Sequence, residues 1–172
     1  MATRYREVVT SQLYDGKTQL NRALQGLKIA AETVLALDEK KRQQTLIRTD
    51  AGGGSDEDIN FLLSRGYLLI TKAYSSRRAE KVCQSVKTWY RDPLVEGREV
   101  GFPSIPHPYC QPTVQVGVRS RRKNGTVSLN WLVCNLSETQ LQQVYYLPKP
   151  WLSLPEPILW WALGCYDLRG GG

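Results

Sequence analysis

Residues 45–70 carry the pattern that most restricts the fold, because two β-type runs flank a glycine loop and a helical segment. The first run, residues 45–50, ends in a carboxylate and opens into residues 51–54, a loop that side chains cannot stiffen. Ser55 with Asp58 three positions later is an N-cap signature, and Gly66 is well placed to end the helix. Residues 67–70 form the second run. This order is typical of an α/β layer with strands buried between helices.

The same alternation extends on both sides of this segment. Residues 6–14 are rich in β-formers and predict a strand that ends before a turn. A helix finishing in the charged segment 38–42 follows, and residues 76–86 predict a further helix. We expect the strands over 6–14, 45–49 and 67–70 to share one sheet, with Asp50 exposed at its rim. The apolar stripe of the first helix consists of Leu20, Ala23, Leu24, Leu27, Ala30, Ala31, Val34 and Leu37.

The pattern changes after Trp89, where prolines interrupt regular elements. Two alternating runs follow, and Asn124-Gly125 between them indicates a hairpin with a type I′ turn. We expect residues 114–134 to form an antiparallel hairpin separate from the first sheet. The sequence therefore predicts three parts: residues 1–88 as the first part of an α/β core, 89–154 as a β-rich insertion, and 155–172 as the start of a C-terminal core helix.

The charge of the chain favours a polyanionic partner. Its 172 residues carry a formal net charge of +7, which suits nucleic acid or an anionic membrane surface. A basic protein with no such partner is the plain alternative. No apolar run is long enough to span a bilayer. The cysteines form no CxxC pair, so buried free thiols are a better interpretation than a zinc site; they are Cys83, Cys110, Cys134 and Cys165.

Asp50 is the first candidate functional residue. A carboxylate at the end of a buried strand lies where α/β folds place functional groups, and it suits Mg²⁺ or Mn²⁺. A turn or helix-cap role is an equally good interpretation of its position. The following glycines suggest a third, phosphate-binding role, but the sequence meets neither the dinucleotide nor the P-loop fingerprint.

Several segments resemble insertion-sequence transposases of the DDE class. Residues 47–57 are similar to the family's second-aspartate block, an apolar strand followed by Arg-x-Asp, a small residue and glycine. Residues 66–72 are similar to the next core strand with its exposed lysine. Residues 8–18 resemble the strand and turn after the first aspartate, and residues 131–136 resemble the last strand of the β insert. Tyr166 and Arg169 resemble the pair that precedes the final glutamate.

The resemblance implies a partial RNase H-like core, a mixed sheet with flanking helices interrupted by a β-rich insertion. It implies metal-dependent DNA strand cleavage and transfer at transposon ends in the intact parent, with Asp50 as catalytic residue and ligand of Mg²⁺ or Mn²⁺. Tyr166 and Arg169 would support the glutamate. A prokaryotic cytoplasmic location, on the nucleoid when DNA is bound, and a homodimer of the parent are compatible with it.

The chain departs from the family at both ends. No block with the first aspartate precedes Arg4, and the chain stops at Gly172 before the final glutamate. We therefore expect an interior fragment that does not cleave DNA alone. The alternatives are a non-catalytic DNA-binding remnant and, less favoured, a phosphate- or nucleotide-binding α/β module.

The basic residues fit a DNA partner. Between Arg65 and Arg91 seven Lys or Arg face one acid, Glu80, which is a local charge of +6. A second group surrounds the hairpin turn, where it would follow a phosphate backbone without reading bases; a solvated, edge-protecting turn is the alternative. We assign the tryptophans to the core and leave Trp89 open. The predicted DNA-binding residues are Lys72, Arg77, Arg78, Lys81, Arg121, Arg122 and Lys123.

Overall fold

The computed structural model describes residues 20–49, 53–92, 95–122 and 124–137. The strand predicted over residues 6–14 and the segment 155–172 lie outside these residues. The helices and strands are α1 (Leu20–Val34), α2 (Glu39–Arg42), β1 (Leu46–Thr49), α3 (Asp56–Ser64), β2 (Leu68–Lys72), α4 (Ser76–Gln84), β3 (Tyr90–Arg91), β4 (Arg98–Gly101), β5 (Val114–Arg121) and β6 (Val127–Cys134).

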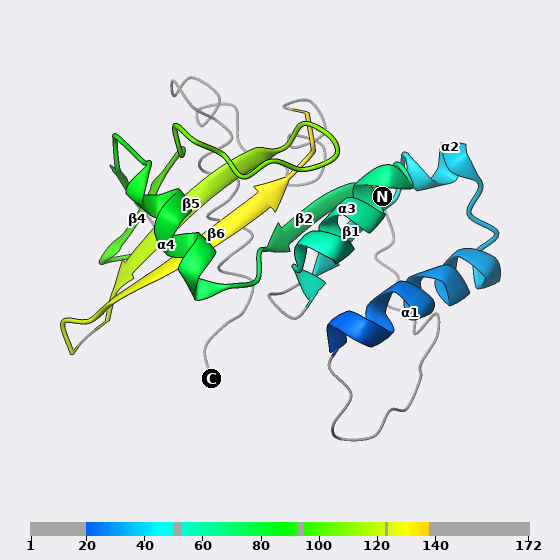
Figure 1. The fold of residues 1–172 in the computed structure, drawn as a ribbon, viewed down its shortest axis with the longest axis horizontal. Coiled ribbons are helices and arrows are strands. Elements are labelled where there is room, and N and C mark those ends of the chain that lie inside the picture. Colours follow the sequence, from blue (N-terminus) through cyan, green and yellow to red (C-terminus); the bar gives the residue numbers. More distant parts are fainter. Residues whose placement is uncertain (1–19, 50–52, 93–94, 123, 138–172) are drawn as a thin grey trace, which may run out of the picture.

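A mixed sheet of six strands, in the order β1-β2-β6-β5-β4-β3, forms the centre of the α/β fold (Figure 1). β1 and β2 are parallel and are connected through α3, whereas the other neighbouring strands are antiparallel. The prediction that the strands near residues 45–49 and 67–70 share a sheet is confirmed. The N-cap is also confirmed, since the Ser55 side chain accepts a hydrogen bond from the Asp58 amide.

The hairpin of β5 and β6 exists, but the expectation that it is separate from the sheet was wrong. β6 pairs with β2, and the ladder is extended by the side chain of Asn135. Its Oδ1 accepts from the Leu69 amide at 2.7 Å, and its Nδ2 donates to the Tyr67 carbonyl at 2.8 Å. The proline-rich stretch also holds a regular strand that we did not predict, β4. The predicted three-part division of the chain stays a prediction.

The turn of this hairpin differs from the predicted two-residue type I′ turn. Three positions, 123–125, separate the closing residues, since the Arg122 amide donates to the Thr126 carbonyl at 2.8 Å. The Gly125 amide donates to the Arg122 carbonyl at 2.9 Å, and Gly125 has φ +81°. This is the longer hairpin loop in which glycine occupies the left-handed position. The Asn124 side chain accepts from Thr126 instead of forming half of the turn.

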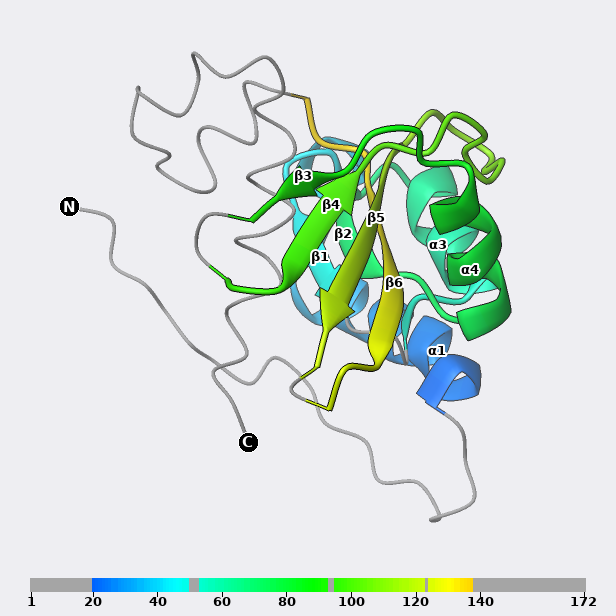
Figure 2. The same cartoon turned by 90° about the vertical axis from the view of Figure 1, so that its left-hand side faces the viewer.

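The helices α3 and α4 lie on one side of the sheet (Figure 2). Because side chains alternate along a strand, the sheet contributes to two apolar clusters. Trp131 and Val133 pack with Leu62 of α3 and Val82 of α4. The opposite face holds a cluster that includes Ile70, Val100, Val116, Val118, Leu132 and Cys134. Trp131 is fully buried, which confirms its assignment to the core.

The first helix is shorter than predicted. α1 ends at Val34, Ala36 has φ +47°, and Asp38 caps a separate short helix, α2. The break turns the charged segment away from the line of α1, because a left-handed residue cannot continue a right-handed helix.

Side chains join α1 to α3 and β2. The guanidinium of Arg65 donates two hydrogen bonds to the carboxylate of Glu32, and the Tyr67 hydroxyl donates a third at 2.8 Å. Glu32 is buried although it is charged, which its complete set of donors makes tolerable.

The remaining sequence expectations have mixed outcomes. Cys83 and Cys134 are buried and free, but Cys110 is free and exposed, contrary to the prediction for all four cysteines. Among the described residues no helix has the length and apolar character needed to cross a membrane.

Candidate nucleic-acid interface

The carboxyl ends of β1 and β2 meet at one edge of the sheet. Thr49 and Thr71 are register partners, and their hydroxyl oxygens lie 2.7 Å apart in a hydrogen bond. Asp50, the predicted metal ligand, is the next residue after Thr49 and lies outside the described residues. The same holds for Lys123, Tyr166 and Arg169, so these assignments stay predictions.

Gly54 is a glycine because of packing against β2. A Cβ at this position would come within 2.0 Å of the Lys72 carbonyl oxygen, and the Tyr74 amide donates to the Gly54 carbonyl at 2.8 Å. The residue is buried. The close approach explains this glycine without a bound phosphate.

The acidic residues after the loop serve the start of α3, as their positions predict. The Asp58 amide donates to the Ser55 hydroxyl at 3.1 Å, and that hydroxyl donates to the Asp58 carboxylate at 2.7 Å. Asp56 forms an ion pair with Arg78 of α4 and contacts His107 Nε2 at 3.1 Å. Asp56 and Asp58 therefore have structural partners.

α4 places a basic stripe on its solvent side. Its buried residues are Ala79, Val82 and Cys83, which face the sheet, so helical spacing puts Arg77, Arg78 and Lys81 on the outer side. All three are exposed. The side chains of Arg77 and Lys81 form no hydrogen bond or ion pair with any described residue, whereas Arg78 is held by Asp56.

A groove of about 510 Å³ runs beside this stripe. Arg78, Lys81 and Val82 form one wall, and the segment from Ile105 to Pro108 forms the other. The backbone of His107 is fixed by Gln115, whose side chain accepts from its amide at 2.8 Å and donates to its carbonyl at 2.6 Å. The groove thus has a defined second wall next to the basic helix.

The local charge of +6 is divided between different parts of the molecule. Arg65 is used by Glu32. Lys72 is half-buried, contrary to the exposed lysine that the family resemblance implies. Its register partner is Leu132, on the sheet face opposite α4. The structure therefore brings Arg77, Arg78 and Lys81 together, and separates Lys72 from them.

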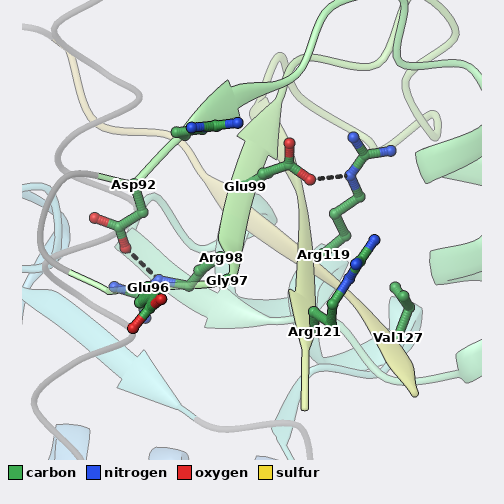
Figure 3. A pocket seen from close by; sticks show the side chains of 9 residues that line it. Asp92, Glu96, Gly97, Arg98, Glu99, Arg119, Arg121 and Val127 are labelled. Atoms are coloured by element: carbon green, nitrogen blue, oxygen red, sulfur yellow. Dashed lines mark hydrogen bonds and ion pairs between the residues drawn. The ribbon is translucent and has the colours of Figure 1, made fainter. Parts of the chain in front are cut away.

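A second basic group lies near the hairpin turn, at the far end of the sheet face that α4 covers. Arg121 and Arg122 are exposed near the hairpin turn, as predicted. Arg121 lines a hollow of about 700 Å³, together with Arg91 of β3 and Arg119 of β5 (Figure 3). Arg119 belongs to the basic group expected around the hairpin turn and Arg91 to the basic stretch, but neither is among the DNA-binding residues predicted from the sequence. The spacing of Arg119 and Arg121 signals a shared strand face, but the position of Arg91 depends on strand pairing.

Trp89 belongs to this second group. The guanidinium carbon of Arg119 lies 4.5 Å from the centre of its ring, a cation–π arrangement. A Cβ on Gly117 would approach the same ring at 3.4 Å. Arg119 and Gly117 therefore lie against the Trp89 ring. This tryptophan, whose role the sequence left open, packs against the protein.

No group of three possible metal-ligating side chains gathers in the part of the chain that the structure describes. Comparisons with protein-family models, curated proteins and solved structures found no match.

Proposed function

We propose that this chain is part of a DDE-class transposase core that binds the DNA backbone along α4, next to the edge at which Asp50 follows β1. The proposal combines the sequence resemblance with the basic stripe of Arg77, Arg78 and Lys81. DNA at transposon ends is then the partner, and metal-dependent strand cleavage and transfer is the reaction of the intact parent. An RNase H-like core and a cytoplasmic location on the nucleoid belong to this proposal.

The parallel pairing of Thr49 with Thr71 is the observation that carries the proposal. Parallel strands end at the same edge, and in α/β folds ligands bind outside the carboxyl ends of the strands. Asp50 follows directly after Thr49, and α4 begins five residues after Thr71 with Ser76. A phosphate backbone along the first turns of α4 would therefore run close to that edge.

The basic side chains of α4 and the carboxylate of Asp50 would make different chemical contributions. Lysine and arginine neutralise phosphates and position a duplex without reading its sequence. A carboxylate at Asp50 suits Mg²⁺ or Mn²⁺, which would polarise the reacting phosphate. Of the acids that follow the loop, Asp56 pairs with Arg78 and Asp58 accepts a hydrogen bond from Ser55. In this proposal the described residues of the chain position the DNA backbone.

Binding of a labelled DNA duplex at two salt concentrations tests the proposal. We expect affinity to fall steeply with salt, and Arg77→Ala with Lys81→Ala to reduce the slope of log affinity against log salt by about 0.9 for each lost phosphate contact. Lys40→Ala with Lys41→Ala, on α2, removes the same charge as a control. Salt-independent binding, or equal loss in both double variants, would contradict the proposal.

The non-catalytic alternative uses the same basic stripe but does not use Asp50. Mn²⁺ separates the two, because it broadens NMR signals near its site. In a DDE core, Mn²⁺ should broaden the amide signals of Thr49 and Thr71, and Asp50→Asn should remove the effect while leaving duplex binding intact. No broadening in the wild-type chain would favour the non-catalytic remnant.

A further inference from the structure

Three arginines and one glutamate share the sheet face that lines the hollow of Figure 3. Arg91 opposes Glu99, and Glu99 opposes Arg119, in the register of three neighbouring strands. Directly opposed residues point to the same side of a sheet, and Arg121 follows Arg119 by two positions. Tertiary pairing thus collects cations that are up to 30 residues apart in the sequence.

Only one of these arginines is engaged. Arg119 donates a hydrogen bond to Glu99 at 2.5 Å and stacks over Trp89. The side chains of Arg91 and Arg121 are exposed, and neither guanidinium forms a hydrogen bond or ion pair with any described residue. Their charges nevertheless act at Glu99: after the hydrogen bond from Arg119, they help to lower the pKa of that carboxyl group. The glutamate therefore neutralises one cation and leaves two.

The Asp92–Arg98 ion pair of the hollow does not neutralise Arg91 and Arg121. Asp92 and Arg98 form an ion pair in which both side chains are almost fully buried, and Figure 3 shows it on the other side of β4 from Glu99 and Arg119. Glu96 is the remaining acid of the lining. Two free guanidinium groups beside a space of about 700 Å³ are suited to a doubly charged oxyanion.

We propose that this hollow binds a phosphate group through Arg91 and Arg121, with Arg119 fixed beside them by Glu99 and Trp89. Guanidinium groups match phosphate oxygens in planar, bidentate hydrogen bonds. The phosphate is either a free phosphate compound or part of a polynucleotide; the second source rests on the proposed DNA function. In that case the DNA path extends from α4 across the same face to the hairpin.

Arginine side-chain NMR tests this assignment on the full chain. Pyrophosphate is titrated while the Nε–Hε signals are recorded, and the same titration is repeated with a short duplex. We expect saturable shifts of Arg91 and Arg121, and at least about tenfold weaker pyrophosphate binding in Arg91→Ala with Arg121→Ala, since each contact is a charge-assisted hydrogen bond. Lys40→Ala with Lys41→Ala on α2, which lies outside both proposed sites, removes the same charge and should bind pyrophosphate normally.

The outcomes separate this inference from the proposed function. Loss of duplex binding only in the Arg77→Ala, Lys81→Ala variant, with unshifted Arg91 and Arg121 signals in the wild-type chain, would overturn the hollow and leave the proposed DNA function standing. Saturable pyrophosphate shifts without any duplex binding would support the hollow and overturn the DNA function. Equal weakening of pyrophosphate binding in the Arg91/Arg121 and Lys40/Lys41 double variants would show a general charge effect and overturn the site. Thermal unfolding of each variant shows whether it is folded.

Discussion

Two arginine–glutamate networks lie at opposite ends of the molecule, one between α1 and α3 and the other in the hollow beside β4 (Figure 1). In the first, Glu32 is buried and receives hydrogen bonds from Arg65 and Tyr67. In the second, Glu99 is about one-third exposed and receives one hydrogen bond, from Arg119. Both carboxylates have a lowered pKa, and in each case the hydrogen bond from arginine is the main cause.

The difference lies in how donors and acceptors are matched. The two carboxylate oxygens of Glu32 accept the hydrogen bonds of Arg65 and Tyr67, so these donors are occupied, and the network joins α1 to α3. The cations around Glu99 outnumber it, so that network keeps positive charge for an external anion. The same residue types therefore stabilise the contact between α1 and α3 in one place and, we propose, bind an anion in the other.

The largest expected effect distinguishes the two glutamates by stability. Glu32→Ala should lower the free energy of unfolding by about 2 kcal/mol, because it leaves the Arg65 and Tyr67 donors without an acceptor. Glu99→Ala should cost less than about 1 kcal/mol, because exposed ion pairs contribute little. Urea unfolding of both variants measures the difference, and equal losses would contradict the distinction.

The same comparison has a pH dependence. The pKa of Glu32 is lowered in the folded state, so its contribution is fully present above the ordinary value of 4.5 and is lost as pH falls through the lowered pKa. The Glu32→Gln variant should lack this part of the acid destabilisation. An unchanged acid profile in that variant would mean that other carboxylates dominate.

A smaller effect is expected at Lys28, the other charged residue of α1 at this contact. Lys28 is buried, and its Nζ has no hydrogen-bond partner among the described residues. Burial lowers its pKa to about 8, against the opposing attraction of Asp58. Lys28→Met should therefore stabilise the chain at neutral pH by about 1 kcal/mol.

The pH profile of the lysine variant provides the check. Between pH 8 and the ordinary value of 10.5 the unfolded chain binds more protons at Lys28 than the folded chain does, so stability should rise with pH in this window. Lys28→Met should remove the rise. A destabilised variant would mean that the ammonium group has a favourable role at the contact.

The smallest expected effect sharpens the description of the hollow as an open network. Glu99→Gln removes the one acid of the arginine row, so pyrophosphate binding, measured by calorimetry, should strengthen by about 0.5–1 kcal/mol. The control is Glu57→Gln in the first turn of α3, which removes one exposed negative charge outside the hollow. Gln115 is left unchanged, because it holds His107. Weaker binding would show that the fixed position of Arg119 matters more than the charge of Glu99.

Local patterns predicted the local structure well. The Ser55 cap, the end of α3 just before Gly66, the strands around residues 46–49 and 68–72, and the α4 helix all follow from hydrophobic spacing and capping residues. The prediction of the turn type was wrong. At the hairpin, Asn124-Gly125 favours a two-residue turn, but the chain forms a three-residue loop in which glycine alone occupies the left-handed position.

The candidate site was predicted in part. Exposed Arg77, Arg78 and Lys81 follow from the helical spacing of α4, because the opposite positions are apolar. The pairing of β2 with β6, whose register partners Thr71 and Val133 are 62 residues apart, did not follow, since antiparallel pairing has no signal in either strand alone. That pairing makes the hairpin part of the sheet and carries the arginine row onto the α4 face.

The sequence by itself determined the elements, their caps and the alternation of apolar and polar side chains along them. It also determined the surplus of positive charge. Only the tertiary structure decided which charges are used and which remain available. Arg65 and Arg91 both belong to the basic stretch, but Arg65 meets a buried carboxylate and Arg91 is exposed at the lining of the hollow. Neighbours in space decide the role of an arginine, because the cost or gain of its charge depends on burial and on the nearest acceptor.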